Sequence, residues 1–513
     1  MSSRRITAAL AVAALATPLL VASAGSATAA DPGKDARRLA ARLVSESTAK
    51  NAYKHLQKFQ EIADANGGTR AAGTPGHDAS AAYVYGQLKK AGYDVTYQPF
   101  EFYTSVTTKE TLSVVSPDPR SVPIFAMTFS KSTPAGGLTA PITVNPLEDD
   151  GRHGCDPDDF ADGDYTGKIA LIKRGGCTFL IKQANAAAAG AAGALIYNNA
   201  PGPLNGTLGD APAVQLPTGG ISTADGEALA AAAAQGTVTV NLDLQVTVER
   251  SVTNNVIAET KGGDPNNVVM LGAHLDSVNA GPGINDNGSG SAGLIEVARK
   301  LAESEKSPRN KVRFAWWSAE ELNLVGSTYY VNNASAAERA KIKLYLNFDM
   351  IASPNYGLFV YDGDNSDGVG AGAGPEGSAQ LERTITDFMD GKGYPHEGTD
   401  FTGRSDYGPF INIAGIPSGG TFTGAEGVKT AAQAQKFGGT ADVSYDHCYH
   451  QACDTIANIN MTAFDANIDV IANSTGLYAH DLSSLTEPVD FVPTNGTAGS
   501  GGGLHDDEHE VTQ

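Results

Sequence analysis

The sequence lacks the features that mark several large classes of protein. Beyond residue 30 no stretch approaches the roughly twenty uninterrupted apolar residues that a membrane-spanning helix needs. No repeat of the solenoid type is present. We therefore expect a soluble mature chain with no membrane partner.

Basic residues are also scarce. Lysine and arginine number 36 against 57 acidic residues, which gives a net charge of -21. Such a charge disfavours nucleic acid and anionic membranes as partners. With 513 residues, of which 41% are hydrophobic, the chain has room for two or three domains with real cores.

The N-terminus has the layout of a secretory signal peptide (1–29). Arg4 and Arg5 precede an apolar run, and the small residues Ala27-Thr28-Ala29 offer a cleavage site. Pro18 interrupts the run, which is too short to span a membrane. We expect a secreted, extracellular protein; the alternative is a disordered N-terminus retained in the cytoplasm.

Four cysteines fit an exported protein with two disulfides. Three pairings are possible from the sequence alone. Closeness along the chain favours Cys155 with Cys177 and Cys448 with Cys453.

Composition divides the chain into segments. Residues 30–45 are polar, with no clear core pattern, and suggest a propeptide or a loose arm. Residues 103–250 carry no cluster of metal-binding side chains and are interpreted as a domain inserted into a first domain of residues 46–102 and 251–485. From residue 486 the chain is rich in Gly, Ser, Asp and His, which predicts a disordered tail (486–513).

After Asn255 strands alternate with helices. Val268–Leu271, residues 312–316 and residues 344–348 have strand patterns, and Ala292–Leu301 has a helical one. This order predicts an α/β fold with a mainly parallel central sheet flanked by helices. In such sheets ligands bind beyond the carboxyl ends of the strands.

Potential metal ligands follow these strands. They are His274 after the first, Glu320 and Glu321 after the second, Asp349 after the third, Asp286 in a Gly-rich loop, and His450 near the C-terminus. Taken singly, an aspartate such as Asp286 is usually a turn former or a helix cap. Acidic and imidazole groups at one end of a sheet, however, repel or stay unpaired unless a cation joins them. Zinc accepts both ligand types, and two histidines with three carboxylates suit two ions sharing one bridging carboxylate.

Seven motifs resemble the M28 family of zinc aminopeptidases, especially the secreted bacterial type that prefers leucine. They are GAHLDS, GINDNGSGSAG, RFAWWSAEEL, GSTYYVNN, YLNFDM, GRSDYGPF and CYHQACDT, within residues 255–470, and residues 50–100 also match. The resemblance implies that His274 and Asp349 hold one zinc and Glu321 and His450 the other. Asp286 would then bridge the two ions.

The resemblance also implies roles beyond the metal ligands. Glu320 is expected to be the general base, and Tyr449 to donate a hydrogen bond to the developing oxyanion. Asp276 is expected to orient the first imidazole, and Arg404 and Phe422 to line the substrate pocket. Plain packing is the alternative for Tyr449. Substrates would be peptide and protein N-termini, with large hydrophobic residues such as Leu preferred.

A calcium site is a further implication. Asp465 and Asp469 match two aspartates of that site and lie four residues apart, on one face if helical. The N-terminal partner would fall near Glu46, where the match is poor. An acidic pair on a solvated helix is the alternative.

The Cys448–Cys453 loop carries the second imidazole. A disulfide closing it would hold the ligand and the oxyanion donor in place. The family motif selects His450 over its neighbour His447, which we expect to face solvent.

The inserted segment has a resemblance of its own. GKIALIKRGGCTFLIKQANAAAAGAAGALIYNN resembles the protease-associated (PA) domain, which is β-rich and carries no catalytic groups. It implies a local Cys155–Cys177 disulfide, and a domain that restricts entry to the cleft or contacts substrate.

Three alternatives stay open. The same metal architecture serves carboxypeptidases, dipeptidases and glutaminyl cyclases, although the lengths of the CYHQACDT and AWWSAEEL matches favour an aminopeptidase. Some relatives with a PA insert are binding proteins that have lost their metals, but here all five ligand positions and Glu320 are present. Metal scavenging by the tail residues His505 and His509 is a weaker idea. We expect a monomer.

Overall fold

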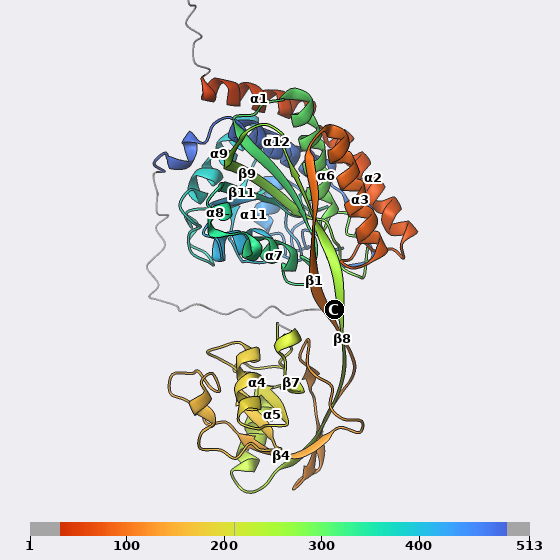
Figure 1. The fold of residues 1–513 in the computed structure, drawn as a ribbon, viewed down its shortest axis with the longest axis vertical. Coiled ribbons are helices and arrows are strands. Elements are labelled where there is room, and N and C mark those ends of the chain that lie inside the picture. Colours follow the sequence, from red (N-terminus) through yellow and green to blue (C-terminus); the bar gives the residue numbers. More distant parts are fainter. Residues whose placement is uncertain (1–30, 210, 490–513) are drawn as a thin grey trace, which may run out of the picture.

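The computed structural model describes residues 31–209 and 211–489. The predicted signal peptide and most of the predicted tail lie outside the described residues. Two lobes are joined by a pair of long strands, β1 and β8 (Figure 1). Within the two described ranges, no helix combines the length and the apolar character needed to cross a bilayer.

The larger lobe is built on a mixed sheet whose centre is parallel. The central strands are β9 (Asp264–His274), β10 (Asn310–Trp317), β11 (Ile342–Phe348) and β14 (Ser418–Phe422). β12 (Phe359–Tyr361) pairs antiparallel with β14 and parallel with β13 (Glu397–Thr399) at one edge. The predicted α/β fold with a mainly parallel sheet is confirmed, and the three predicted strands lie within β9, β10 and β11.

Side-chain alternation gives each face of this sheet its own core. On β9, Val269 and Leu271 join one apolar cluster, whereas Val268 and Met270 join the other. Trp316 and Trp317, the only two tryptophans, are fully buried on opposite faces. Each buried Val, Leu or Met contributes about 1.5–3 kcal/mol, so a one-residue slip in register would be strongly disfavoured.

Helices cover both faces. The first face carries α1 (Pro32–Glu46), α2 (Ala49–Ala65), α3 (Pro75–Ala91), α6 (Gly288–Ser304), α9 (Ser378–Lys392) and α12 (Met461–Tyr478). The second carries α7 (Val325–Asn333) and α10 (Tyr407–Asn412). Short elements complete the lobe: α8 (Ala336–Arg339) and α11 (Ala431–Phe437). The result is a sheet enclosed between helices.

The segment expected to be a loose arm is a helix in the structure. The side chain of Asp31 accepts a hydrogen bond from Gly33 N, and Pro32 occupies the first turn, so α1 has a complete N-terminal signal. Leu39 and Leu43 are buried in the core that α12 also lines. The loose-arm expectation was wrong because the buried stripe is narrow and lies among charged residues; whether a propeptide is removed stays a prediction.

The smaller lobe contains the inserted domain. Its strands β4 (Leu138–Val144), β5 (Ile169–Lys173), β6 (Gly193–Tyr197), β7 (Thr218–Ile221) and the short β3 (Phe125–Ala126) form a sheet with α4 (Phe179–Ala188) and α5 (Thr223–Ala233). β2 (Arg120–Val122) pairs with β1. The Cys155–Cys177 disulfide is confirmed.

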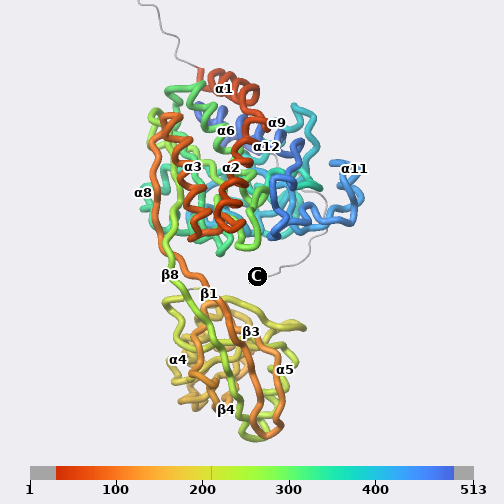
Figure 2. The backbone as a smooth tube through the Cα atoms, turned by 90° about the vertical axis from the view of Figure 1, so that its right-hand side faces the viewer, coloured from red at the N-terminus to blue at the C-terminus, as the bar shows by residue number. Residues whose placement is uncertain are grey.

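No loop linker separates the two lobes. β1 (Asp94–Ser116) and β8 (Thr239–Glu259) run through both as one antiparallel ribbon, which Figure 2 shows from the side. The expected boundaries, 102/103 and 250/251, lie inside this ribbon, where Phe102 pairs with Ser251 and Tyr103 with Arg250. A long antiparallel ladder, with register shifts at Thr107/Lys109 and Val114/Ser116, therefore connects the lobes.

The ribbon also fixes which edge of the sheet faces the inserted domain. β8 enters the larger lobe from the inserted domain and pairs antiparallel with β10, which is parallel to β9. The carboxyl ends of the parallel strands therefore point toward the inserted domain (Figure 1). Ligands bound at this edge would lie on the side where that domain stands.

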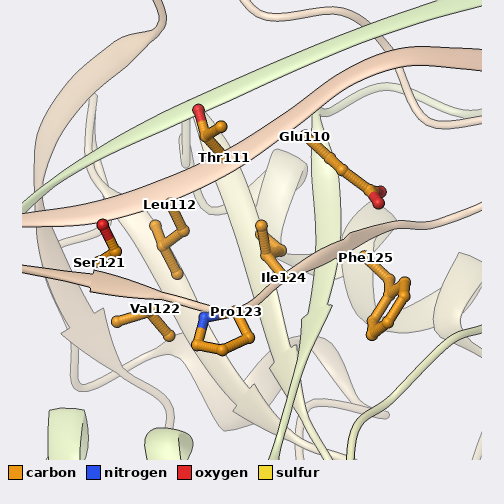
Figure 3. Close-up of a pocket in the computed structure, with 8 residues that line it drawn as sticks. All are labelled: Glu110, Thr111, Leu112, Ser121, Val122, Pro123, Ile124 and Phe125. Atoms are coloured by element: carbon orange, nitrogen blue, oxygen red, sulfur yellow. The ribbon is translucent and has the colours of Figure 1, made fainter.

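The inserted domain has a pocket of its own. Residues Glu110, Thr111 and Leu112 of β1 line it together with the segment 121–125 (Figure 3). The Glu110 carboxylate accepts a hydrogen bond from Ala126 N at 2.7 Å. The pocket is thus largely apolar, and its carboxylate already has a main-chain partner.

Candidate metal centre and active site

The bridging candidate Asp286 lies between the two candidate histidines. Its Oδ1 is 3.1 Å from His274 Nε2, and its Oδ2 is 3.4 Å from His450 Nε2. His274 ends β9, and Asp286 lies two residues before α6 begins. The two oxygens of one carboxylate therefore face two different imidazoles, as a bridge between two metal ions requires.

The other two predicted ligands complete the two halves of this cluster. Asp349 follows β11, and its Oδ1 is 3.2 Å from His274 Nε2. Glu321 follows β10, and its Oε2 is 3.0 Å from His450 Nε2. The structure thus brings all five predicted ligands together in the predicted pairs.

His274 presents the nitrogen that a metal needs. Its Nδ1 lies 3.1 Å from the main-chain oxygen of Asp276 and 3.8 Å from Asp276 Oδ1. Donation of Nδ1–H to that oxygen leaves the Nε2 lone pair facing the carboxylates. The nearer orienting group is therefore the main chain of Asp276, while its side-chain Oδ1 accepts Glu320 N at 3.3 Å.

A chain of buried hydrogen bonds holds Asp349 from behind. Ser405 Oγ donates to Asp349 Oδ2 at 2.5 Å, and Asn347 Nδ2 donates to Ser405 Oγ at 2.8 Å. Tyr345 Oη donates in turn to Asn347 Oδ1 at 2.9 Å. These contacts occupy Oδ2 and leave Oδ1 directed at His274.

Close packing places the start of α6 against β11. A Cβ at Gly290, in the first turn of α6, would lie 2.0 Å from the carbonyl oxygen of Phe348. Only glycine permits this approach, which brings Asp286 beside Asp349. Ala319, Met350 and His450 have positive φ values of 58°, 48° and 56°; non-glycine residues hold such conformations only where the surroundings enforce them, often at functional sites.

The cluster gathers buried carboxylates around two imidazoles, and its electrostatics favour a cation. Burial raises the pKa of Glu320 well above its usual range. Burial and the neighbouring Asp286 raise the pKa of Glu321 to about 7. Burial alone would lower the pKa of His274, but the carboxylates of Asp349 and Glu320 outweigh it and raise that pKa. These shifts reflect an excess of buried negative charge, which a bound cation would offset.

Metal ions fit this donor set. One ligand atom from each of His274, Glu320 and Asp349 lies within 4.8 Å of the others, and the same holds for His274, Asp286 and Glu321. Glu321 Oε1 is buried and has no hydrogen-bond partner among the described residues. Imidazole nitrogens and carboxylate oxygens are zinc ligands. The unpartnered Oε1 of Glu321 is therefore a candidate metal-ligand atom.

Tyr449 and its neighbours lie at the rim. Tyr449 stacks on the His450 ring with centroids 3.8 Å apart. Arg404 donates to Tyr449 Oη at 3.2 Å and to Glu426 Oε1 at 2.6 Å. Burial, with Asp286 nearby, raises the pKa of Tyr449, so the hydroxyl keeps its proton. Because Arg404 uses a lone pair of Oη, that proton remains available to donate.

Phe422 stands at the same edge. It is the last residue of β14, which pairs with β11, and it is half-buried beside Phe359. Its position is compatible with a pocket wall next to Asp349. The structure therefore places both predicted substrate-pocket residues, Arg404 and Phe422, at the sheet edge that carries the cluster.

The Cys448–Cys453 disulfide is confirmed, and it closes the loop that carries His450. His447 is exposed, as predicted for the rival of His450. We expect the Cys448→Ser/Cys453→Ser double variant to weaken zinc binding at His450 about tenfold, because the loop loses its constraint. Zinc titration of the purified protein measures this. The matched control, Cys155→Ser/Cys177→Ser in the inserted domain, should leave zinc affinity unchanged. A Cys448→Ser/Cys453→Ser variant that binds zinc as tightly as this control would show that the short loop needs no disulfide.

The expected calcium pair has other partners. Asp469 Oδ2 accepts Tyr394 Oη at 2.9 Å and lies 2.8 Å from Lys392 Nζ. Asp465 Oδ1 accepts Ala49 N at 3.1 Å. Glu46 pairs with Arg42 at 2.9 Å. The Lys392 ammonium therefore offsets the negative charge of Asp469 alone, and the calcium site stays a prediction.

Two functional residues went unnoticed in the sequence. Asp454 accepts hydrogen bonds from Asn285 N and Asp286 N, both at 2.9 Å, and so holds the bridging candidate from behind. Arg70 is fully buried between α2 and α3. Asp454 could have been suspected from its place in CYHQACDT; Arg70 had no signal except the turn-rich GGTR segment.

The carboxyl edge of the mainly parallel sheet thus carries five metal-ligand candidates, a buried carboxylate and a tyrosine at the rim of the cluster. This combination defines a metal-dependent hydrolase. The model of peptidase family M28 matches residues 255–475, and that of the PA domain matches residues 138–229. The chain belongs to peptidase family M28 and is a metallo-aminopeptidase of that family, with an inserted PA domain.

Relatives that match most of this chain support this assignment. The chain is 48% identical over 458 residues to an aminopeptidase of Pseudomonas aeruginosa, covering 86% of this chain and 82% of that protein. It is 48% identical over 420 residues to a probable leucine aminopeptidase 2 of Aspergillus fumigatus, covering 81% and 80%. The solved aminopeptidase from Aneurinibacillus sp. strain AM-1 superposes with a TM-score of 0.67 at 28% identity, covering 88% of this chain and 99% of that one.

Proposed function

We propose that this enzyme is a secreted aminopeptidase that binds two zinc ions and removes N-terminal residues from peptides, preferring large hydrophobic ones such as leucine. The observation that carries the proposal is the position of Asp286 between His274 and His450. One carboxylate facing two imidazoles, each with its own second carboxylate, is a donor set for two ions rather than one. Zinc itself follows from the family.

The division of roles follows from position. His274 and Asp349 would hold one zinc, Glu321 and His450 the other, with Asp286 shared. Zinc, when bound, supplies Lewis acidity that polarises the scissile carbonyl and favours deprotonation of water. Glu320 takes the proton from the attacking water and passes it to the leaving amine.

The restriction to chain ends follows from charge. The carboxylates of Glu320 and Asp349 would attract a free α-ammonium group, which an internal peptide bond lacks. The PA domain stands on the side toward which the sheet edge points (Figure 1). We propose that it restricts entry or contacts the part of the substrate beyond the first residue.

Tyr449 would donate to the oxyanion. Tyr449→Phe is expected to lower kcat about 10²–10³-fold with little change in KM, because a donor used in the transition state is lost. Steady-state kinetics on a leucine anilide measures this. The control is Tyr445→Phe, whose hydroxyl bonds Gln433 Oε1 at 2.6 Å and should not affect kcat. A kcat for Tyr449→Phe equal to that of the wild type would return Tyr449 to a packing role.

Zinc binding should compete with protons. Burial acts to lower the pKa of His450, but its contacts with Asp286 and Glu321 outweigh this and raise it to about 10 in the metal-free protein. His450 is then protonated at neutral pH, and zinc needs the neutral imidazole. We expect apparent zinc affinity to fall about tenfold or more from pH 8 to pH 6, as measured with a zinc-buffering chelator. An affinity independent of pH in that range would contradict the assignment of His450.

The free amine provides the test against other exopeptidases. We expect rapid cleavage of leucine para-nitroanilide and none of its N-acetylated form. Cleavage of both would indicate an endopeptidase or deblocking activity. Cleavage of neither by a zinc-loaded protein would favour a carboxypeptidase, a dipeptidase or a cyclase.

Secretion and a monomeric state complete the proposal. Two disulfides and the signal-like N-terminus support export. Calcium at Asp465 and Asp469 stays a prediction, although Lys392 pairs with Asp469.

A further inference from the structure

Arg70 has an unusual environment. It lies in the connection between α2 and α3, and its side chain is fully buried. A buried guanidinium normally pairs with a carboxylate. Here its three nitrogens donate instead to main-chain carbonyls: Nε to Pro282 O at 2.7 Å, Nη2 to Gly283 O at 2.5 Å, and Nη1 to Leu275 O.

All three carbonyls belong to one connection. Residues 275–287 join the end of β9 to the start of α6 and contain neither helix nor strand. Leu275 directly follows His274, and Gly283 precedes Asp286 by three residues. The guanidinium therefore ties the two ends of this connection to each other.

Neighbouring contacts fix the middle of the same connection. Arg70 N donates to Ser277 Oγ at 3.0 Å, and Thr69 Oγ1 donates to Val278 O at 2.9 Å. The Arg70 guanidinium also lies 5.0 Å from the centre of the Phe59 ring of α2, which restricts its orientation. The α2–α3 connection thus acts as a clamp on residues 275–283.

We propose that Arg70 is a positioning residue that sets the separation of His274 and Asp286, and thereby the affinity of the centre for its shared metal ions. The proposal rests on the proposed two-zinc function. Arg70 would act through the backbone of residues 275–283 and would contact neither metal nor substrate. A planar fork with three fixed donor directions can hold three carbonyls at once, which a lysine ammonium cannot reproduce in that geometry.

Charge is a second contribution. Burial lowers the pKa of Arg70 to about 10, against the opposing effect of Asp276, Asp454 and Asp286. The group therefore remains a cation at neutral pH. It offsets part of the negative charge around Asp286 before metal binds, while keeping hydrogen-bond contact only with carbonyls.

The test is zinc binding by Arg70→Lys, which keeps the charge and loses the fork. We expect at least one zinc to bind about 10–100-fold more weakly in a chelator-buffered titration, as for other residues that orient ligands. The rise in Tm that zinc produces should shrink accordingly. The matched control is Arg313→Lys, a largely buried arginine that pairs with Glu259 in the same lobe. Arg313→Lys should lower Tm both with and without zinc, and should leave zinc affinity unchanged.

Thr69→Val provides a milder second variant if Arg70→Lys fails to fold. Loss of the Val278 contact should weaken zinc binding in the same direction by a smaller factor. This inference alone would be overturned if the wild type binds two zincs and Arg70→Lys binds them with wild-type affinity. Where Arg70→Lys cannot be made, wild-type zinc affinity in Thr69→Val would overturn it. No zinc on the wild type would overturn the proposed function and this inference with it.

Discussion

Replacing Glu320 by glutamine is expected to lower kcat about 10³-fold while both zincs remain bound. The carboxamide keeps the size of the side chain but cannot accept the proton of the attacking water. Glu320 is buried, and its Oε2 lies 3.8 Å from His274 Nε2. The corresponding distances from Asp286 Oδ1 and Asp349 Oδ1 to this nitrogen are 3.1 Å and 3.2 Å. We expect Glu320 to act as a base beside the metal ions and not as a ligand.

Two measurements define the outcome for Glu320. Zinc content by elemental analysis should equal that of the wild type, and turnover of leucine para-nitroanilide should be nearly lost. Glu296→Gln is the matched control, since Glu296 is a buried glutamate of α6 paired with Arg299. Near-normal turnover in Glu320→Gln would remove Glu320 from the mechanism, and loss of zinc would make it a ligand.

Replacing Asp286 by asparagine is expected to cost both metal and activity. An amide is a poor bridge between two ions because it offers one oxygen and no negative charge. Asparagine would keep only one of the two Asp286 oxygens, which lie near His274 and His450. We expect zinc to fall from two ions per chain to one or fewer. Activity should fall more than about 10³-fold, since metal ions supply several kcal/mol of transition-state stabilisation.

A buried aspartate elsewhere separates this effect from general destabilisation. Asp243 pairs with Lys109 at the ribbon, far along β8 from the cluster, and Asp243→Asn should keep both zincs and full activity. Two zincs on Asp286→Asn at wild-type affinity would show that the ions do not share this residue.

The sheet and the ligand cluster could be predicted because their signals are local. His274, Glu321 and Asp349 follow strands with clear patterns, and parallel strands bring their carboxyl ends together whatever the rest of the chain does. His450 came only through its motif, since nothing nearby in the sequence shows that its loop reaches Asp286. The two disulfides followed from closeness along the chain.

Other features depend on contacts between distant segments. The burial of Arg70 against residues 275–283, more than two hundred positions away, leaves no periodicity to detect. Asp454 acts on Asp286 through main-chain N–H groups, which any sequence supplies. Lys392 reaches Asp469 only because α9 packs on α12. The α1 helix differs, because Asp31, Pro32 and the Leu39–Leu43 spacing were visible and the charged residues around them obscured the pattern.

The most direct test of the account is hydrolysis of leucine para-nitroanilide by the purified protein, with and without a zinc chelator, together with its zinc content. We predict rapid cleavage, about two zincs per chain, and loss of activity on chelation that returns when zinc is restored. Full activity in a protein stripped of zinc would contradict the central claim that these five residues form a catalytic two-zinc centre.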